Sequence, residues 1–374
     1  MNQNRDPQLF VDGKSFFPAL LRTVDQAEKS IFINMFIWRD DEIGNALAHA
    51  LLRAMDRGVR VEISKDRYGV VLELAEEGQS SFFHKKPTLS ERAKAAVLRR
   101  LYHHGKKLHP KTRDETLYAR FIHHPNLSLD CERFKADHSK YYIIDGKALF
   151  LGGINVEDKE NGLDREGRLY QDYMVGVYGE EKVRDFLSQL QAEPKTEKAL
   201  FYGYNDNTDK KRFFMEALYL DVIQSAEREL HITMAYFSPC KRFIKAIRAA
   251  EERGVRISIL VPERANFQSD TNLKTVKRLL RRSHGGVSVY LSPKMVHTKL
   301  IKSEKMISLG STNITKKAFS QLSELNLFLK NGDDELASSL VGAMKENYAL
   351  SKKVNDPKYI KYNPLKAFFE GFLV

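Results

Sequence analysis

Two short segments of the chain repeat a histidine and a lysine two positions apart. They are His138 and Lys140 in DHSKYYI, and His297 and Lys299 in VHTKLI. Because side chains i and i+2 of a β-strand lie on one face, each histidine should lie beside its lysine. Two polar side chains on one face of an otherwise apolar strand are unusual, since such a strand is expected to bury itself.

Each copy also places an asparagine on a glycine-containing bend after the following strand. The asparagines are Asn155, in LGGIN, and Asn313, in LGSTN. Taken singly, these residues have structural explanations: a satisfied strand histidine, a lysine that reaches solvent along the sheet edge, and ordinary turn chemistry. The duplication favours a shared function instead.

Two histidines, two lysines and two asparagines predict a site for a phosphate ester. Ammonium groups and side-chain amides can hold the non-bridging oxygens of a phosphate. One neutral imidazole can attack phosphorus while the other, protonated, donates to the leaving oxygen. Both protonation states are accessible to histidine near neutral pH. This chemistry needs no metal or cofactor, and we expect none.

A reacting histidine also needs an acceptor that holds its second ring nitrogen. Two carboxylates follow the motifs at similar distances: Asp172, in YQDYMVGVYG after His138, and Glu324, in LSELNLFL after His297. Each begins a strand-like segment. The alternative for both is a solvated carboxylate at a strand end.

The other histidines are not predicted to bind a metal. Five of them lie in a basic stretch without an evident set of acidic or cysteine co-ligands: His103, His104, His109, His123 and His124. We expect a solvated or phosphate-facing surface there. The two cysteines, Cys131 and Cys240, form no disulfide framework and indicate a reducing compartment.

The repeat extends to the elements that must position these residues. AEKSIFINMFI (27–37) matches AERELHITMAY (226–236), and RGVRVEI (57–63) matches RGVRISI (253–259). The second phrase is typical of a helix that ends at a glycine and leads into a β-branched strand. We therefore predict an α/β fold of two similar α/β units, with mixed sheets flanked by helices.

These units are expected to pack about a pseudo-two-fold axis with the active site between them. The polar segment 193–211 is the natural boundary. The predicted domains are residues 1–195, with the first motif, and residues 196–374, with the second.

The residue that closes each motif is expected to be structural. Asp145, with Gly146, predicts a two-residue hairpin turn. The corresponding residue in the second copy is Glu304. Both lie at the far end of the strand from the histidine, which argues against a catalytic role.

Composition and charge limit the class of protein. The chain has 374 residues, 42% of them hydrophobic and 29% charged, and its net charge is +12. This balance favours an anionic membrane surface or a nucleic acid as partner. No apolar run reaches the roughly 18–20 residues of a spanning helix, and the N-terminus does not resemble a signal peptide. We expect a cytoplasmic protein that associates peripherally with the membrane; the oligomeric state stays open.

The residues now described resemble the paired HKD motifs of the phospholipase D superfamily. HSKYYIIDGKALFLGGIN is most similar to the first motif of cardiolipin synthase-type phosphatidyltransferases, and the resemblance covers nearly the whole chain. QDYMVGVYG resembles the segment that carries the acidic partner of the first histidine. The second copy departs from the pattern in two places: Glu304 replaces aspartate, and KKAF (316–319) stands where many relatives have an Arg-Ser pair.

The resemblance implies a role for each motif residue. His138 would be the nucleophile that forms a phosphohistidine, and His297 the general acid, although the order could be reversed. Asp172 and Glu324 would orient the histidines. The phosphate would be held by Lys140, Lys299, Asn155 and Asn313.

The implied function is phosphatidyl transfer on phospholipids, as in a cardiolipin synthase. The alternatives are a phospholipase D that releases phosphatidic acid and a metal-independent nuclease of the same superfamily. A catalytically dead binding protein is disfavoured, because both sets of histidine, lysine and asparagine are present. Headgroup and acceptor stay open.

Three segments favour a lipid over a nucleic acid. They are SSFFHKKP (80–87), the chain end YIKYNPLKAFFEGFLV (359–374) and LKTVKRLLRRS (273–283). The first two combine aromatic and basic residues, as bilayer interfaces require, but could equally pack on the core. The third predicts a helix with Lys274, Lys277, Arg278, Arg281 and Arg282 on one face and apolar residues on another. A solvated basic face is the default for such a helix, and attraction to phosphates or headgroups is the alternative.

Overall fold

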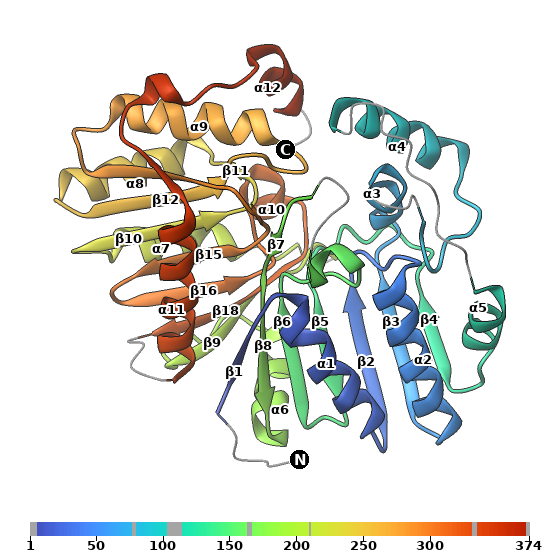
Figure 1. Ribbon diagram of the computed structural model, residues 1–374. Helices are drawn as coiled ribbons and strands as arrows, with labels where there is room; N and C mark the ends of the chain where they lie inside the picture. Colours follow the sequence, from blue (N-terminus) through green and yellow to red (C-terminus); the bar gives the residue numbers. More distant parts are fainter. Residues whose placement is uncertain are drawn as a thin grey trace. The chain divides into compact units, whose positions relative to one another are not determined.

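The computed structural model describes residues 6–76, 80–102, 114–162, 167–208, 211–330 and 335–371 (Figure 1). The chain forms two compact units. The first contains Met1–Tyr170 and Met174–Arg184, and the second contains Gln171–Tyr173 and Asp185–Val374. Among the described residues, no helix has the length and apolar character needed to cross a bilayer.

The first unit is built on a seven-stranded mixed sheet with the order β1-β8-β6-β5-β2-β3-β4. Its strands are β1 (Gln8–Val11), β2 (Ser30–Met35), β3 (Arg60–Lys65), β4 (Leu127–Asp130), β5 (Tyr141–Ile144), β6 (Ala148–Gly152) and β8 (Tyr173–Tyr178). Strands β2, β3 and β4 run parallel, whereas β5, β6 and β8 pair antiparallel with their neighbours. Its helices are α1 (Asp12–Asp25), α2 (Glu42–Asp56), α3 (Gly69–Ala75), α4 (Leu89–Tyr102) and α5 (Glu115–Ile122), with α6 (Glu180–Leu190) at the boundary and a short 3-10 turn, η1 (Asp158–Asn161).

The second unit repeats this order strand for strand. Its sheet runs β19-β13-β12-β10-β15-β16-β18-β9. The strands are β9 (Leu200–Asn205), β10 (Glu229–Met234), β12 (Arg256–Pro262), β13 (Val287–Ser292), β15 (Lys299–Ser303), β16 (Met306–Gly310), β18 (Glu324–Lys330) and β19 (Lys352–Val354). The helices are α7 (Met215–Gln224), α8 (Lys241–Glu252), α9 (Ser269–Arg282), α10 (Lys316–Ser320), α11 (Glu335–Leu350), α12 (Pro364–Glu370) and the 3-10 turn η2 (Pro357–Tyr359).

The two sheets differ only in the added edge strand β19. The predicted fold class is therefore confirmed: the chain consists of two similar α/β halves with mixed sheets and flanking helices. The predicted boundary between the two sequence repeats, at residues 195 and 196, stays a prediction.

Helices α1 and α2 cover one face of the first sheet (Figure 1), and aromatic residues fill the space between. Phe16 of α1 lies 5.7 Å from Tyr142 of β5 and 5.8 Å from Phe150 of β6, measured between ring centroids. Burying one such side chain stabilises the fold by about 1.5–3 kcal/mol. This packing fixes β5, the strand that follows His138 and Lys140.

The loop at residues 80–87 belongs to the same core. Phe82 and Phe83 are buried and pack on Trp38 and Phe121. Of the two alternatives for this loop, packing on the core is the one observed, because Trp38 and Phe121 contact both rings. Lys85 pairs with Asp40 at 2.7 Å instead of facing a lipid.

Asp145 anchors the start of β2 to the far end of the β5–β6 hairpin. Its carboxylate accepts the backbone N–H groups of Glu28, Lys29 and Ser30, at 2.9, 2.7 and 3.0 Å. The hairpin has a tight turn with positive φ at Asp145 and Gly146, but three residues, not two, separate the paired Ile144 and Ala148.

Glu304 makes the same contacts in the second unit. It accepts the N–H groups of Glu227, Arg228 and Glu229, at 2.7, 3.4 and 3.2 Å. Burial opposes ionisation of Glu304, but these N–H groups outweigh it and lower the pKa. The longer glutamate thus performs the anchoring that aspartate performs in the first copy.

Removing either anchor should destabilise the fold. We expect Asp145→Ala and Glu304→Ala each to lower the free energy of unfolding by about 1–3 kcal/mol, since three N–H groups lose a charged acceptor. Glu304→Asp should lose less. Because the folded pKa of Glu304 is depressed, its contribution should be present above pH 4.5 and disappear as the pH falls. Urea unfolding followed by circular dichroism measures this, and an Asp145→Ala variant as stable as the parent would contradict it.

Candidate active site

The second unit assembles a buried charged group around His297. This residue lies between the short strand β14 (Met295–Val296) and β15, which begins at Lys299. His297 Nδ1 is 2.8 Å from Asp172 Oδ2, and Lys299 Nζ is 3.7 Å from the same oxygen. Because a carboxylate can only accept, Nδ1 carries the proton in this contact.

Backbone pairing brings Asp172 to this position. The amide of His297 donates to the carbonyl oxygen of Gln171 at 2.7 Å, and Thr298 Oγ1 donates to the same oxygen at 3.4 Å. The backbone N–H of Tyr173 donates to Asp172 Oδ1 at 2.8 Å. Both carboxylate oxygens are therefore held before any substrate binds.

This pairing corrects one expectation. The resemblance implied that Asp172 serves His138 and that Glu324 serves His297, but Asp172 contacts the second histidine. The physical reason is that residues 171–173 leave the first unit and pair with the second. Glu324 is fully buried at the start of β18, where Ser311 Oγ donates to it.

The charge of Asp172 is stabilised in spite of its burial. Desolvation alone would raise the pKa of this carboxyl group, but the positive charge of Lys299 and the hydrogen bond from His297 lower it below the usual value. Asp172 is therefore an anion at neutral pH. An anion on Nδ1 favours the imidazolium form of His297.

Asn313 lies on the bend after β16 and is almost fully buried. Its side-chain oxygen accepts the backbone N–H of Tyr236 at 3.2 Å. With the oxygen engaged, the amide nitrogen is the end that can donate to a phosphate. The lysine is also oriented, because Lys299 Nζ donates to the carbonyl oxygen of His297.

The first unit repeats the lysine contact. Lys140 is fully buried, and its Nζ donates to the carbonyl oxygen of His138, as Lys299 does for His297. The ring of Phe36 meets His138 edge-on, with 4.8 Å between centroids, and Lys140 Nζ lies 5.3 Å from the Phe36 centroid. Each lysine Nζ is thus held at the backbone carbonyl oxygen of its own histidine. The predicted strand does not include the pairs, because β5 begins at Tyr141, after His138 and Lys140, and β15 begins at Lys299, after His297.

Asn155 is also buried, and its amide nitrogen lies 3.4 Å from Glu157 Oε1. Its side-chain oxygen is buried without a hydrogen-bond partner among the described residues. The two asparagines therefore differ: Asn313 is fixed by a backbone N–H, and Asn155 by a carboxylate.

Sequence reasoning missed a hydrogen-bonded segment that leads into His138. Asn34 Nδ2 donates to Asp137 at 3.0 Å and to Ser139 Oγ at 2.9 Å. Burial raises the pKa of Asp137 to about 6, and the amide of Asp137 donates to Asp66 at 2.7 Å. The one available signal was the aspartate that directly precedes the histidine.

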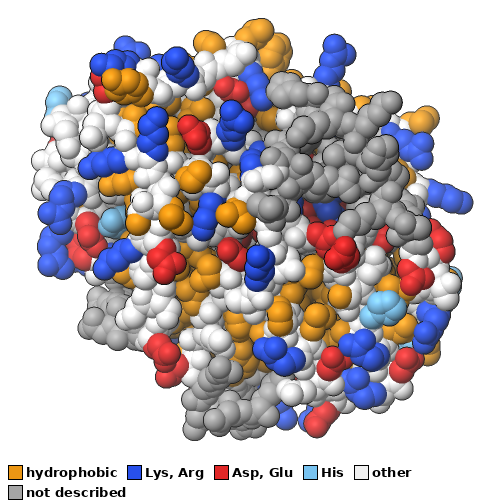
Figure 2. All heavy atoms as spheres, viewed as in Figure 1, with side chains coloured by type: hydrophobic (Ala, Val, Ile, Leu, Met, Phe, Trp, Pro, Cys, Tyr) orange, Lys and Arg blue, Asp and Glu red, His pale blue; other side chains and the backbone are white. Residues whose placement is uncertain are grey.

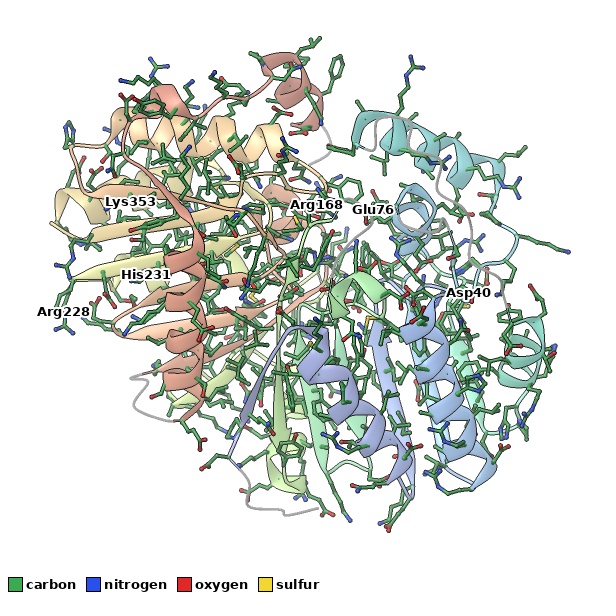
Figure 3. The ribbon with its side chains drawn as sticks, in the orientation of Figure 1. Asp40, Glu76, Arg168, Arg228, His231 and Lys353 are labelled. Carbon is green, nitrogen blue, oxygen red and sulfur yellow. The ribbon has the colours of Figure 1, made fainter. Side chains whose placement is uncertain are left out.

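It also missed a buried ion network behind Asn155. Arg39 Nε lies 2.6 Å from Glu157, and Lys159 Nζ lies 2.8 Å from Glu76 and 3.4 Å from Glu157. Lys65 and Glu73 form a further pair at 3.0 Å. Glu76 is labelled in Figure 3, as is Asp40, the residue that follows Arg39 in the chain. The three cations and three carboxylates balance, as buried charges must.

The second unit has no counterpart of the Arg39–Glu157 pair. Trp38 bridges Val156 in parallel, and strand β11 (Phe237–Ser238) pairs in parallel with β17 (Ile314–Thr315). The equivalents of Arg39 and Glu157 are therefore Ser238 and Thr315. The repeats diverge here by a paired exchange of two charges for two hydroxyl groups.

One group of described side chains in the first unit could bring three metal-ligand atoms together. His84, Cys131 and Glu132 place a nitrogen, a sulfur and an oxygen within 4.8 Å of one another. Burial raises the pKa of the Cys131 thiol to about 11, which opposes the thiolate that metal binding needs. Of the histidines in the basic stretch, His103, His104 and His109 lie outside the described residues, and His124 lies 3.3 Å from Asp56.

Comparison with known proteins matches this architecture. The family model "Cardiolipin synthase, PLD-like domain" matches residues 20–192 and 219–346. Cardiolipin synthase B of Salmonella typhi is 30% identical over 351 residues, which cover 86% of this chain and 76% of that protein. Cardiolipin synthase 2 of Staphylococcus epidermidis is 25% identical over 394 residues, which cover 99% of this chain and 74% of that protein.

A solved structure shares the fold. Phosphatidylserine synthase of Haemophilus influenzae superposes with a TM-score of 0.70 at 12% identity, over 99% of this chain and 93% of that one. The family model and the curated relatives confirm the predicted superfamily, and with it the prediction that the chain is an enzyme. The family model matches one segment in each half, and the curated relatives are similar over most of the chain. The chain therefore belongs to the cardiolipin synthase family of phospholipase D-like proteins.

Proposed function

We propose that the protein transfers phosphatidyl groups on phospholipids, in the manner of a cardiolipin synthase, through a phosphohistidine. The observation that carries the proposal is the His297–Asp172–Lys299 group, together with a second histidine and lysine in matching geometry. Family membership supports the substrate class. The roles below are assigned to this chain's residues on that basis.

In the first step, a ring nitrogen of His138 attacks phosphorus and the bond from phosphorus to the leaving alcohol breaks. His297 gives its proton to the leaving oxygen. In the second step, the acceptor alcohol attacks the phosphohistidine, the phosphorus–nitrogen bond breaks and His297 takes the alcohol's proton. With phosphatidylglycerol as donor and acceptor, the products are cardiolipin and glycerol.

The charge on Asp172 supports the assignment of His297 as the acid. The first step needs one protonated imidazole, and an adjacent carboxylate favours that form. The remaining polar groups would hold the phosphate: Lys140, Lys299, Asn155 and Asn313. Their four donors lie on buried or nearly buried side chains, where charge-assisted hydrogen bonds are strong.

We further propose that the second unit meets an anionic membrane through α12. This helix exposes Leu365, Phe368 and Phe369, at 66, 57 and 51% of their surface, while Ala367 and Glu370 are buried. Thr271 of α9 donates its backbone N–H to Glu370 at 2.7 Å, so α12 is docked by one face and presents apolar side chains on the other. In Figure 2, hydrophobic side chains lie at the surface over α12, with Lys and Arg side chains beside them.

The basic face predicted for residues 273–283 is present on α9. Lys274, Arg278, Arg281 and Arg282 are exposed, and the apolar face of the helix is buried. Lys277 differs, because its Nζ donates to the carbonyl oxygen of Ile360 at 2.8 Å. Cations beside exposed phenylalanines match an anionic headgroup layer over acyl chains, which is why we propose a bilayer as partner.

Lipid turnover is the direct test of the reaction. Incubation with phosphatidylglycerol vesicles should yield cardiolipin and glycerol by mass spectrometry. His138→Ala and His297→Ala should each lower the rate at least about 10³-fold, since each removes a reacting group. His123→Ala, at an exposed histidine, is the matched control, and a chelator should have no effect.

Other products would revise the proposal in specific ways. Phosphatidic acid in place of cardiolipin would mean that water is the acceptor. Cleavage of single-stranded DNA without any lipid turnover would refute the lipid assignment. An active His138→Ala, His297→Ala double variant would refute the two-histidine mechanism.

The pairing of Asp172 with His297 has its own signature. Asp172→Asn should lower kcat about 10²-fold or more, because the amide no longer stabilises the imidazolium. The alkaline limb of the pH–rate profile should move to lower pH, since His297 then loses its proton more readily. Because the pKa of Asp172 lies below its usual 3.8, the defect should extend over the whole range above that pH. Asp185→Asn, which removes a half-buried carboxylate of the same unit, is the control, and an unchanged profile in Asp172→Asn would contradict this role.

Vesicle flotation tests the membrane contact. Replacing Leu365, Phe368 and Phe369 by serine should weaken binding to phosphatidylglycerol vesicles at least about tenfold, because three apolar side chains no longer enter the interface. Leu350→Ser, at an exposed leucine of α11, should bind like the parent. Arg281→Ala with Arg282→Ala should reduce the salt sensitivity of binding. Unchanged flotation of the triple variant would refute this contact.

A further inference from the structure

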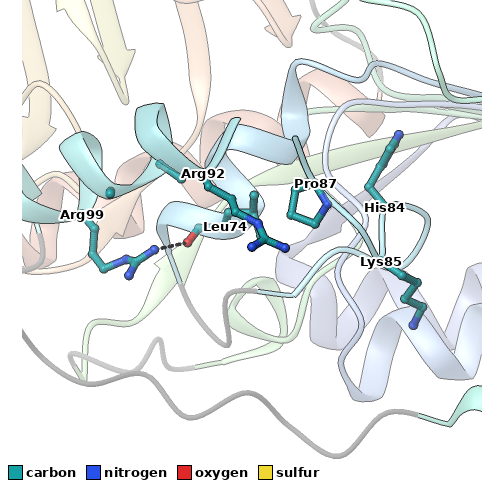
Figure 4. Close-up of a pocket in the computed structure, with 8 residues that line it drawn as sticks. Leu74, His84, Lys85, Pro87, Arg92 and Arg99 are labelled. Carbon is teal, nitrogen blue, oxygen red and sulfur yellow. Dashed lines mark hydrogen bonds between the residues drawn. The ribbon is translucent and has the colours of Figure 1, made fainter. Parts of the chain in front are cut away.

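A cavity of 420 Å³ lies in the first unit, between α3, α4 and the loop that follows residue 80 (Figure 4). Its volume is within the range of pockets that hold small ligands. None of its lining residues belongs to the histidine, lysine and asparagine motifs. The proposed reaction therefore leaves this cavity without a function.

One wall is a continuous stripe of α4. Arg92, Ala95, Ala96 and Arg99 all line the cavity, and their spacing of i, i+3, i+4 and i+7 places them on one side of the helix. Two small residues thus form the floor between two guanidinium groups. The two arginines are two turns apart, and their long side chains can reach one ligand from both ends.

The charges of this cavity are only partly balanced. Lys85 is neutralised by Asp40 at 2.7 Å. Arg92 and Arg99 form no ion pair with a described residue, and Arg99 instead donates to the carbonyl oxygen of Leu74 at 3.2 Å, as Figure 4 shows. Arg99 Nε is buried without a hydrogen-bond partner among the described residues. A buried, unpaired guanidinium N–H is costly unless a ligand accepts it.

A second buried nitrogen in the cavity also has no hydrogen-bond partner among the described residues. His84 is more than nine-tenths buried and lines the cavity, and its Nδ1 has no hydrogen-bond partner among the described residues. Its Nε2 is 2.9 Å from the carbonyl oxygen of Cys131. Burial and the charge of Lys65 lower the pKa of His84. Among the described residues, the cavity therefore offers two guanidinium groups without an ion-pair partner and one buried imidazole.

The remaining lining of the cavity is apolar. Leu74 and Pro87 line it together with Ala95 and Ala96 of α4. A free phosphate would use the two arginines but not this apolar surface. A phosphate attached to a glycerol and an acyl chain would use both.

We propose that this pocket binds the phosphate head of an anionic phospholipid, held between Arg92 and Arg99, with the glycerol backbone and first methylenes against Leu74 and Pro87. This second phosphate site goes beyond the proposed function and takes no part in the transfer step. It would bind a lipid whether or not the protein turns one over.

Hydrogen exchange with mass spectrometry locates such binding directly. The whole chain carrying His138→Ala, which prevents turnover, is mixed with monomeric dihexanoyl phosphatidylglycerol or with inorganic phosphate. We expect the lipid to protect peptides that cover residues 84–99. The change Arg92→Ala with Arg99→Ala should weaken the apparent affinity at this region at least about tenfold, since two charge-assisted contacts are lost.

The matched control removes equal charge from the same helix. Lys94 and Arg100 are exposed on α4 and do not line the cavity, so Lys94→Ala with Arg100→Ala should leave the protection unchanged. Protection by inorganic phosphate as strong as by the lipid would overturn the lipid assignment. Absence of protection by the lipid, or equal loss in both double variants, would overturn the pocket itself. Because the readout is binding in an inactive background, failure here is distinguishable from failure of the proposed transfer reaction.

Discussion

A buried carboxylate between a lysine and a histidine is the interaction on which the second half of the molecule depends. Asp172, Lys299 and His297 are buried together, and removing one partner of a buried charged group leaves the others uncompensated. That requirement explains the backbone around them. The carbonyl oxygen of Gln171 accepts hydrogen bonds from both His297 and Thr298. Residues 171–173, which carry Asp172, are therefore held by the same segment that carries His297.

The repeat shows which contacts the architecture needs and which it can exchange. Strand order, the lysine contact with the histidine carbonyl and the anchoring carboxylate occur in both halves. The support behind the asparagine does not. The first half uses an ion pair between Arg39 and Glu157, where the second half has Ser238 and Thr315. Both charged residues must be replaced together at such a buried position, because replacing only one of them would leave the other charge buried and unpaired.

Much of the fold could be predicted from the sequence because its signals are local. The spacing of His138 and Lys140 and the repeated strand phrases each depend on residues close in the chain. The partner of Asp172 could not be predicted, because order along the chain does not say which strand a crossing segment will join. The position of Phe82 and Phe83 stayed open for a related reason: an aromatic pair beside lysines has the same sequence pattern in a surface loop and in a loop that packs on Trp38. The ion network was hidden because its charges come from four separate segments.

The contacts of Glu304 bear on how proteins of this kind are recognised. The acidic residue that closes each motif serves as a clamp for three consecutive backbone N–H groups, and a side chain longer by one methylene still reaches all three. This position needs a carboxylate oxygen that reaches the three backbone N–H groups, and either aspartate or glutamate can supply it. A signature search that insists on aspartate would therefore overlook second copies whose glutamate closes the same clamp.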